Sequence, residues 1–272
     1  MYLDNIYNEH KAYSSSSSRA GSAQLAPCIC CFKSGPSIFK LLKIKGYQYK
    51  GITGNFSYSR PWARHIISED EAIELARKVT PNDVKQAVFD ISEDKAPGPN
   101  GFSSGFFKAA WPVVGTEVTK VVLEFFATGK LLKQVNATLL SLIPKVWSPT
   151  MVGEFRPISC CNVLYKVITK IIVMRRSVVL DSLIRPSQNA FVSGRTISDN
   201  ILLAQLLPPR CALKVDLRKA YDTVERDFLI AVLKLFGFPS LFILWIKECV
   251  TSLLYSVCLN GAAHGYFKGH EA

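Results

Sequence analysis

The sequence lacks an uninterrupted apolar run long enough to cross a membrane. Its most apolar stretch, Leu241 to Leu259, carries Lys247 and Glu248 near the middle, and charges at that depth of a bilayer are costly. We therefore expect a core helix followed by a strand there. The start, Met1 to Asp4, also lacks the basic and apolar regions of a signal peptide. These absences favour an intracellular protein, in the nucleus or the cytoplasm.

The eight cysteines lack the arrangement of a zinc site. Cys28 to Cys31 contains one CxxC spacing, but no second pair completes a four-ligand set. The remaining cysteines lie in apolar stretches, where free cysteine behaves as a small hydrophobe: Cys160, Cys161, Cys211, Cys249 and Cys258. We expect structural thiols in a reducing compartment.

Acidic residues are scarce in the middle of the chain. Lys130 to Lys219 contains 14 lysines and arginines against 4 aspartates and glutamates, a net charge of +10 out of +12 for the whole chain. A generally basic surface would not concentrate the excess in this way, so the pattern indicates a nucleic-acid or nucleotide channel. Within it, residues 161–184 read as an amphipathic helix whose solvent face is basic. That face is expected to carry Lys166, Lys170, Arg175 and Arg176.

Local signals predict mixed helices and strands from residue 66 onward, after a poorly ordered arm at residues 1–65. Ser68 to Glu71 is a capping box, and Thr80 with Pro81 marks a second helix start. Helical periodicity from Gly105 to Thr128 ends at Gly129, a plausible C-cap. Further helices are expected at 224–236 and 239–251, and strands at 137–146, 212–215 and 253–260.

The stretch from Arg210 to Asp222 contains the most informative carboxylate. A short apolar run, Ala212 to Val215, ends at Asp216, and Tyr221 follows after a charged turn. A carboxylate at the end of a buried strand is costly unless it is paired or binds a cation. From spacing alone, Asp216 could cap a helix, form a salt bridge with a nearby basic residue, or bind a metal.

Asp216 and Tyr221 together resemble the first metal-binding motif of reverse transcriptases, in the form found in LINE-type (non-LTR) retrotransposons. Lys95 to Gly101 resembles the family's entry motif, with Asn at position 100 where Asp is usual. Two fingers motifs and a segment leading into the palm follow in the family's order: Leu142–Lys145, Phe155–Ser159 and Gln188–Arg195. The resemblance covers roughly residues 66–265 and is closest to plant elements.

The resemblance implies an α+β fold: the fingers and a partial palm of a right-hand polymerase, mostly helical with a small antiparallel sheet. It further implies a partial reverse transcriptase domain at residues 66–272, with fingers at 66–205 and the start of the palm at 206–272. In the palm, the 212–215 strand is expected beside the 253–260 strand.

The resemblance also assigns roles to single residues. Lys145 and Arg156 reach from the fingers to the triphosphate of an incoming deoxynucleotide, and Arg and Lys are the side chains suited to phosphate. Tyr221 stacks beneath the incoming sugar and leaves no room for a ribose 2′ hydroxyl. The template strand is expected near Gln188 and Arg195.

Asp216 and the backbone carbonyl of Leu217 are expected to hold Mg²⁺, the family's cofactor. The family completes this site with an Asp-Asp pair, which occurs nowhere in the 272 residues, and the Gln-Gly-x-Pro motif expected after Phe267 is absent too.

The connection after Leu207 is roughly ten residues shorter than usual in the family. We therefore expect a polymerase fragment, cut short and inactive alone, whose partners are RNA template, DNA primer and deoxynucleoside triphosphates. The alternative is a non-catalytic nucleic-acid-binding remnant or a pseudogene product.

Overall fold

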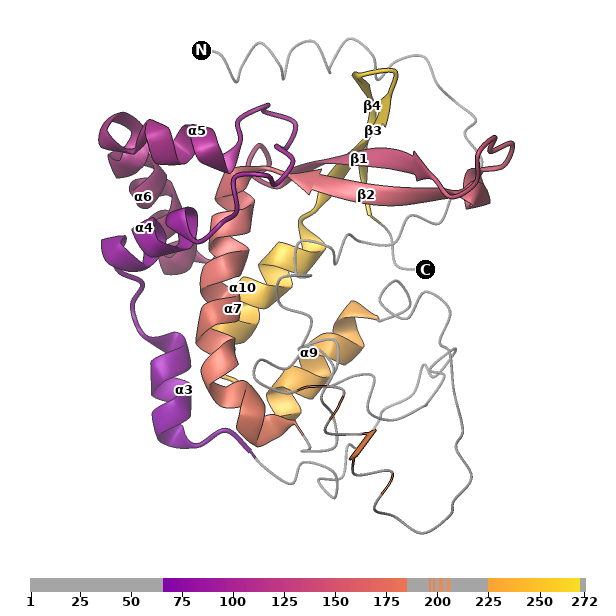
Figure 1. Ribbon diagram of the computed structural model, residues 1–272. Helices are drawn as coiled ribbons and strands as arrows, with labels where there is room; N and C mark the ends of the chain where they lie inside the picture. Colours follow the sequence, from indigo (N-terminus) through magenta and orange to yellow (C-terminus); the bar gives the residue numbers. More distant parts are fainter. Residues whose placement is uncertain are drawn as a thin grey trace.

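The computed structural model describes residues 66–184 and 225–269, and between them Thr196, Ser198, Ile201, Leu202 and Gln205. The predicted arm at residues 1–65 lies outside this part. One long helix, α7 (Val163–Leu183), runs through the middle of the molecule, and a four-stranded sheet lies across its N-terminal end (Figure 1). Four helices contact α7: α3 (Glu69–Ala76), α4 (Pro81–Phe89), α6 (Trp111–Thr128) and α10 (Ser240–Thr251). The helix α5 (Ser104–Ala109) packs on α4 and α6, and α9 (Arg226–Leu235) packs on α10.

The helix ends follow signals in the local sequence. The Ser68 hydroxyl accepts a hydrogen bond from the Glu71 amide at 3.2 Å, and the Ser68 amide donates to the Glu71 carboxylate at 2.9 Å. Thr80 caps α4 in the same reciprocal way, with Pro81 in the first turn. Gly129 ends α6 in the left-handed region at φ 66°. These predicted caps are confirmed.

The helix predicted from Gly105 to Thr128 is in fact two helices. Ala110 separates α5 from α6, and Pro112 lies in the first turn of α6. Proline has no N–H to donate and is tolerated only in the first helical turn. The chain therefore has to end one helix and begin another just before it.

The sheet has the strand order β2-β1-β3-β4. Its strands are β1 (Ala137–Pro144), β2 (Phe155–Cys161), β3 (Leu254–Leu259) and β4 (Ala262–Lys268). The hairpins β1–β2 and β3–β4 are antiparallel, but β1 and β3 pair in parallel. The α+β class is confirmed, and the sheet is mixed where an antiparallel one was expected.

Strand β3 is hydrogen-bonded on both of its edges, by β1 and by β4. It therefore has no free edge for the predicted pairing with residues 212–215, which lie outside the described residues. Strand β4 itself was not predicted. Asn260 and Gly261 join it to β3 with φ of 51° and 82°, and Asn-Gly between apolar runs is a strong signal for such a hairpin.

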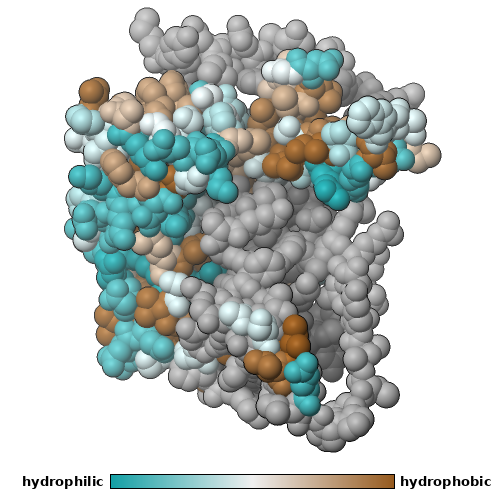
Figure 2. Space-filling model, in the orientation of Figure 1, coloured by the Kyte–Doolittle hydropathy of each residue, from teal (hydrophilic) through white to brown (hydrophobic). Residues whose placement is uncertain are grey.

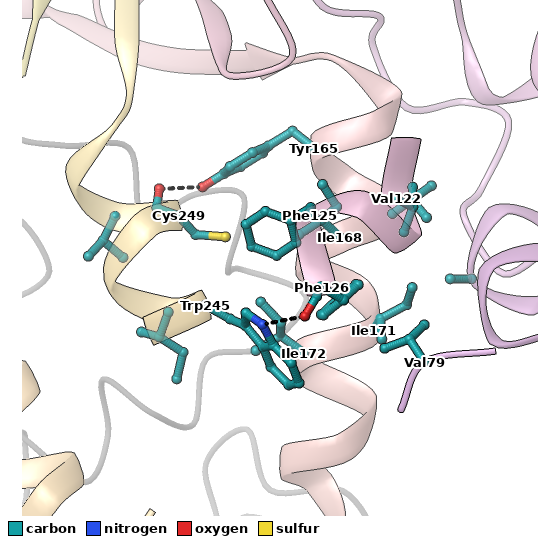
Figure 3. Close-up of a cluster of buried hydrophobic side chains, with 14 of the residues drawn as sticks. Val79, Val122, Phe125, Phe126, Tyr165, Ile168, Ile171, Ile172, Trp245 and Cys249 are labelled. Atoms are coloured by element: carbon teal, nitrogen blue, oxygen red, sulfur yellow. Dashed lines mark hydrogen bonds between the residues drawn. The ribbon is translucent and has the colours of Figure 1, made fainter. Parts of the chain in front are cut away.

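One hydrophobic core unites these elements, with buried members from Ile67 to Tyr255. In Figure 3 the side chains of α7 meet those of α6 and α10. The Tyr165 hydroxyl donates to the Cys249 carbonyl at 3.0 Å, and the indole N–H of Trp245 donates to the Phe126 carbonyl at 3.2 Å. Both carbonyls lie in the last turn of a helix, where the helix itself supplies no donor. The core thus includes residues from both the predicted fingers and the predicted palm.

The prediction of a basic solvent face on α7 is wrong for its two arginines. Arg175 and Arg176 are only 6% and 2% exposed, because α7 is surrounded by other helices. The Arg175 guanidinium donates to the carbonyls of Leu75 and Arg77, at 3.3 and 2.5 Å, at the end of α3. Its Cζ atom also lies 6.0 and 5.6 Å from the ring centres of two core aromatics, Phe126 and Trp245. Burial lowers the pKa of Arg176 to about 10.

The described cysteines partly follow the prediction. Cys160, Cys249 and Cys258 are free thiols, and burial raises the pKa of the Cys249 thiol, which keeps it protonated. Cys161 differs, because it is disulfide-bonded. The sequence gives it no partner at a recognisable spacing, so it was read as a packing thiol. No helix within residues 66–184 or 225–269 is both long and apolar enough to span a bilayer.

Candidate nucleotide-binding face of the β1–β2 hairpin

The register of the β1–β2 hairpin places Lys145 and Arg156 on one face. Ile143 pairs directly with Arg156. The Lys145 amide donates to the Glu154 carbonyl at 2.7 Å, which extends the ladder one step beyond the end of β1. Directly paired residues share a face, as do residues two apart on a strand. Lys145 and Arg156 are therefore diagonal neighbours, about 7–8 Å apart at the backbone.

This face is the one turned away from the core. Along β1 the alternate positions Thr138 and Leu140 are buried, and Thr138 pairs with the buried Tyr255 of β3. Lys145 and Arg156 occupy the other set of positions, and both are exposed. Neither forms an ion pair with a carboxylate among the described residues. Two cations are thus available on one open surface.

Hydrogen bonds close the loop at the tip of this hairpin. The Lys145 ammonium donates to the Gly153 carbonyl at 2.7 Å. The Glu154 carboxylate accepts from the amides of Met151 and Thr150, at 3.1 and 2.6 Å, and these bonds hold its pKa below the ordinary value. The only acid of the loop is therefore occupied by loop amides, and the loop has a defined shape.

Asn162 ties the base of the hairpin to the rest of the fold. Its side-chain amide, 3% exposed, donates to the carbonyls of Gln134, Val135 and Ala137, at 2.9, 3.4 and 3.4 Å, where β1 begins. Its side-chain oxygen accepts from the Asn100 amide at 3.3 Å. One side chain thus joins the start of β1, the junction of β2 with α7, and the loop that resembles the family's entry motif.

The loop from Ala96 to Gly101 is held against this junction by close packing. A Cβ at Gly98 would lie 2.3 Å from both the backbone nitrogen and the side-chain oxygen of Asn162. The Lys166 ammonium donates to the Ala96 carbonyl at 2.5 Å, and burial lowers the pKa of this lysine. The loop therefore connects and positions, through contacts that only glycine at position 98 permits.

Sequence reasoning missed Asn162 and Lys166. The sequence placed both in the helix expected at residues 161–184, with Lys166 on its solvent face and no role for Asn162. The available signal was the glycine-rich loop, whose backbone needs a close partner somewhere in the fold.

The other predicted site residues lie outside the described residues: Gln188, Arg195, Asp216, Leu217 and Tyr221. Their roles stay predictions. Within the part of the chain that the structure describes, no group of three or more His, Cys, Asp or Glu side chains could hold a metal ion.

Comparison with known proteins gives two matches. The family described as "Reverse transcriptase (RNA-dependent DNA polymerase)" matches residues 143–270, from within β1 to just beyond β4. The chain is also 30% identical over 206 residues to the "Transposon TX1 uncharacterized 149 kDa protein" of Xenopus laevis. That alignment covers 71% of this chain but only 16% of the relative. The closer affinity to plant elements stays a prediction.

Proposed function

Because this chain is a reverse transcriptase fragment of the non-LTR retrotransposon family, we propose that its β1–β2 hairpin binds the triphosphate of an incoming deoxynucleotide. The observation that supports this proposal is the placement of Lys145 and Arg156 as neighbours on the exposed face of the hairpin. A guanidinium grips phosphate oxygens as a bidentate fork, and an ammonium adds a compact charge. The pair supplies both kinds of contact.

The surroundings of the pair suit this role. Glu154, the nearest acid along the chain, accepts hydrogen bonds from loop amides and forms no ion pair with Lys145 or Arg156. Asn162 fixes the base of the hairpin to the core. Positioning matters because phosphoryl transfer depends on alignment and charge stabilisation more than on covalent chemistry by the protein.

Reverse transcriptases use divalent metal ions, and we propose that Asp216 and the backbone carbonyl of Leu217 hold Mg²⁺ here. The metal would supply Lewis-acid chemistry there, for activating the primer's 3′ hydroxyl and holding the triphosphate. Tyr221 supports the sugar of the incoming nucleotide. These 272 residues contain no Asp-Asp pair to complete the carboxylate set. We therefore propose that the chain by itself binds substrates without extending a primer.

The nucleic-acid partners follow from the family and the charge distribution. The domain implies an RNA template and a DNA primer, and the basic middle, with +10 of the total charge of +12, is suited to bind their phosphates. Gln188 and Arg195 are the proposed template contacts. The chain would meet these partners inside the cell, in the nucleus or the cytoplasm.

Deoxynucleotide binding tests the hairpin site directly. Arg156→Ala and Lys145→Ala should each weaken binding about 10- to 150-fold, because a hydrogen bond to a charged group contributes roughly 1.5–3 kcal/mol. Lys120→Ala is the matched control, since Lys120 is an exposed cation on α6, away from the hairpin. Equal affinities for Arg156→Ala and Lys120→Ala would show that the triphosphate binds elsewhere.

Primer extension tests the proposed inactivity. Given magnesium, a primed RNA template and deoxynucleotides, the purified chain should add no nucleotide. Extension that Asp216→Ala abolishes would mean that the chain does assemble a working metal site.

A further inference from the structure

The tip of the β1–β2 hairpin exposes large apolar side chains that the nucleotide site does not use. Trp147 is as exposed as a free residue, at 103%, and Met151 and Val152 are exposed to 71% and 75%. Scattered exposed hydrophobic residues are normal, but a loop of ten residues that gathers several of them indicates an interaction site.

This tip is held in shape. The Lys145 amide and ammonium bind the carbonyls of Glu154 and Gly153, and the Glu154 carboxylate binds two loop amides. Figure 1 shows the hairpin reaching away from the helices, with the loop at its far end. Trp147 therefore lies on a loop with a defined conformation, which lowers the conformational entropy lost when Trp147 contacts a partner.

The charges around the tip indicate which kind of partner could bind there. Lys145 and Arg156 are exposed there, and the single acid, Glu154, is engaged by the loop backbone. Hydrophobic and hydrophilic residues lie side by side over this part of the surface in Figure 2. An aromatic side chain flanked by cations is the combination that binds single-stranded nucleic acid, through base stacking and phosphate contacts.

We propose that Trp147 is a stacking platform for an unpaired base of the nucleic-acid strand that this chain binds. A folded protein is a poorer match, because a stable protein interface buries about 800 Å² per partner and this loop offers ten residues. The proposal rests on the proposed function, since it presumes that the chain binds nucleic acid. It extends that function by giving the bound strand a contact at the hairpin tip.

Trp147 variants and a labelled single-stranded oligonucleotide test the proposal by fluorescence anisotropy. Trp147→Ala should weaken binding about 5- to 150-fold, the range of one base–aromatic stacking contact. Trp147→Phe should retain most of the affinity because it keeps a ring, and Trp147→Leu should lose as much as Trp147→Ala. Val113→Ala, which truncates a side chain 82% exposed on α6, should bind like the unaltered chain.

Two further measurements separate stacking from other contacts. The ratio of affinities between the unaltered chain and Trp147→Ala should stay constant as salt is raised, because stacking releases no counterions. A fully paired duplex and a free deoxynucleotide should each bind both proteins equally well, since neither offers an unpaired base within a strand.

The outcomes are distinct. If the unaltered chain binds no oligonucleotide, the proposed function and this inference both fail. If it binds and Trp147→Ala binds equally well, only the stacking proposal fails. Retained affinity in Trp147→Leu overturns the proposal, because it would show an apolar contact with the strand that needs no ring to stack. A matching loss for the free deoxynucleotide overturns it in favour of a contact with the incoming base.

Discussion

Gly98→Ala is expected to destabilise the protein through a single added methyl group. The new Cβ would meet the Asn162 nitrogen and side-chain oxygen at 2.3 Å and its Cα at 2.6 Å, whereas ordinary contacts begin near 3.4 Å. Two of these three atoms belong to the backbone at the junction of β2 and α7, so they cannot move aside as the end of a flexible side chain could. The loop therefore has to shift by about an ångström.

The cost can be worked from the contacts that this shift disturbs. Overpacking a tight site costs roughly 1–3 kcal/mol. Moving the loop also stretches the bond from the Asn100 amide to Asn162, already 3.3 Å long, and such a bond is worth about 1 kcal/mol. We expect a loss of about 2–4 kcal/mol in the free energy of unfolding.

Urea denaturation followed by circular dichroism measures this loss as a lower midpoint at unchanged slope. Gly153→Ala is the matched control, because Gly153 lies in the hairpin loop and a Cβ there meets nothing within 4 Å. Its effect should stay within about 0.5 kcal/mol. If the two variants unfold at the same urea concentration, the loop at Gly98 is not packed against Asn162 and the reasoning is wrong.

Two further predictions concern buried charge and pH. Arg175→Met should lower the free energy of unfolding in urea by about 1–3 kcal/mol, because the carbonyls of Leu75 and Arg77 lose their donor. The control Arg156→Met, at an exposed arginine, should change this free energy little. Equal losses in the two variants would contradict this account. Burial alone would raise the pKa of Asp83, but hydrogen bonds from Arg77 and the Thr80 amide outweigh it and hold the pKa below its ordinary value. Asp83 therefore stabilises the fold above about pH 4 and loses that effect as pH falls through its lowered pKa. Asp83→Asn should be about 1 kcal/mol less stable than the unaltered chain at pH 7, a modest value because the Arg77 side chain is 38% exposed. This difference in stability should disappear in acid. A difference that persists at pH 2 would contradict the assignment.

Local features of the fold could be predicted from the sequence because their causes are local. The caps at Ser68 and Thr80 and the end of α6 at Gly129 depend on residues within one turn. The parallel pairing of β1 with β3 depends instead on strands more than 100 residues apart, and no nearby residue encodes it. The burial of Arg175 was missed for a related reason, since composition cannot distinguish a solvated guanidinium from one that binds distant carbonyls.

In the candidate site, too, local features could be predicted from the sequence and long-range contacts could not. The sequence identified Lys145 and Arg156 as cations one hairpin apart, but their common face follows from the register, which the Lys145–Glu154 bond extends. Asn162 was missed because its partner Asn100 lies 62 residues earlier in the chain. Its role appears only when the entry loop, the strands and α7 are brought together.

The pairing of β1 with β3 has a consequence for how the chain folds during translation. When the ribosome has made β1, β2 and α7, one edge of β1 is still unpaired, because its partner β3 begins only at Leu254. Trp245 of α10, which binds the end of α6 and packs against Arg175, is also still to come. Non-local contacts of this kind form late, and an open strand edge invites pairing with other chains in the meantime. A gene copy whose reading frame ends before β3 would therefore encode a peptide that tends to aggregate. A product that folds needs a reading frame that continues through β3.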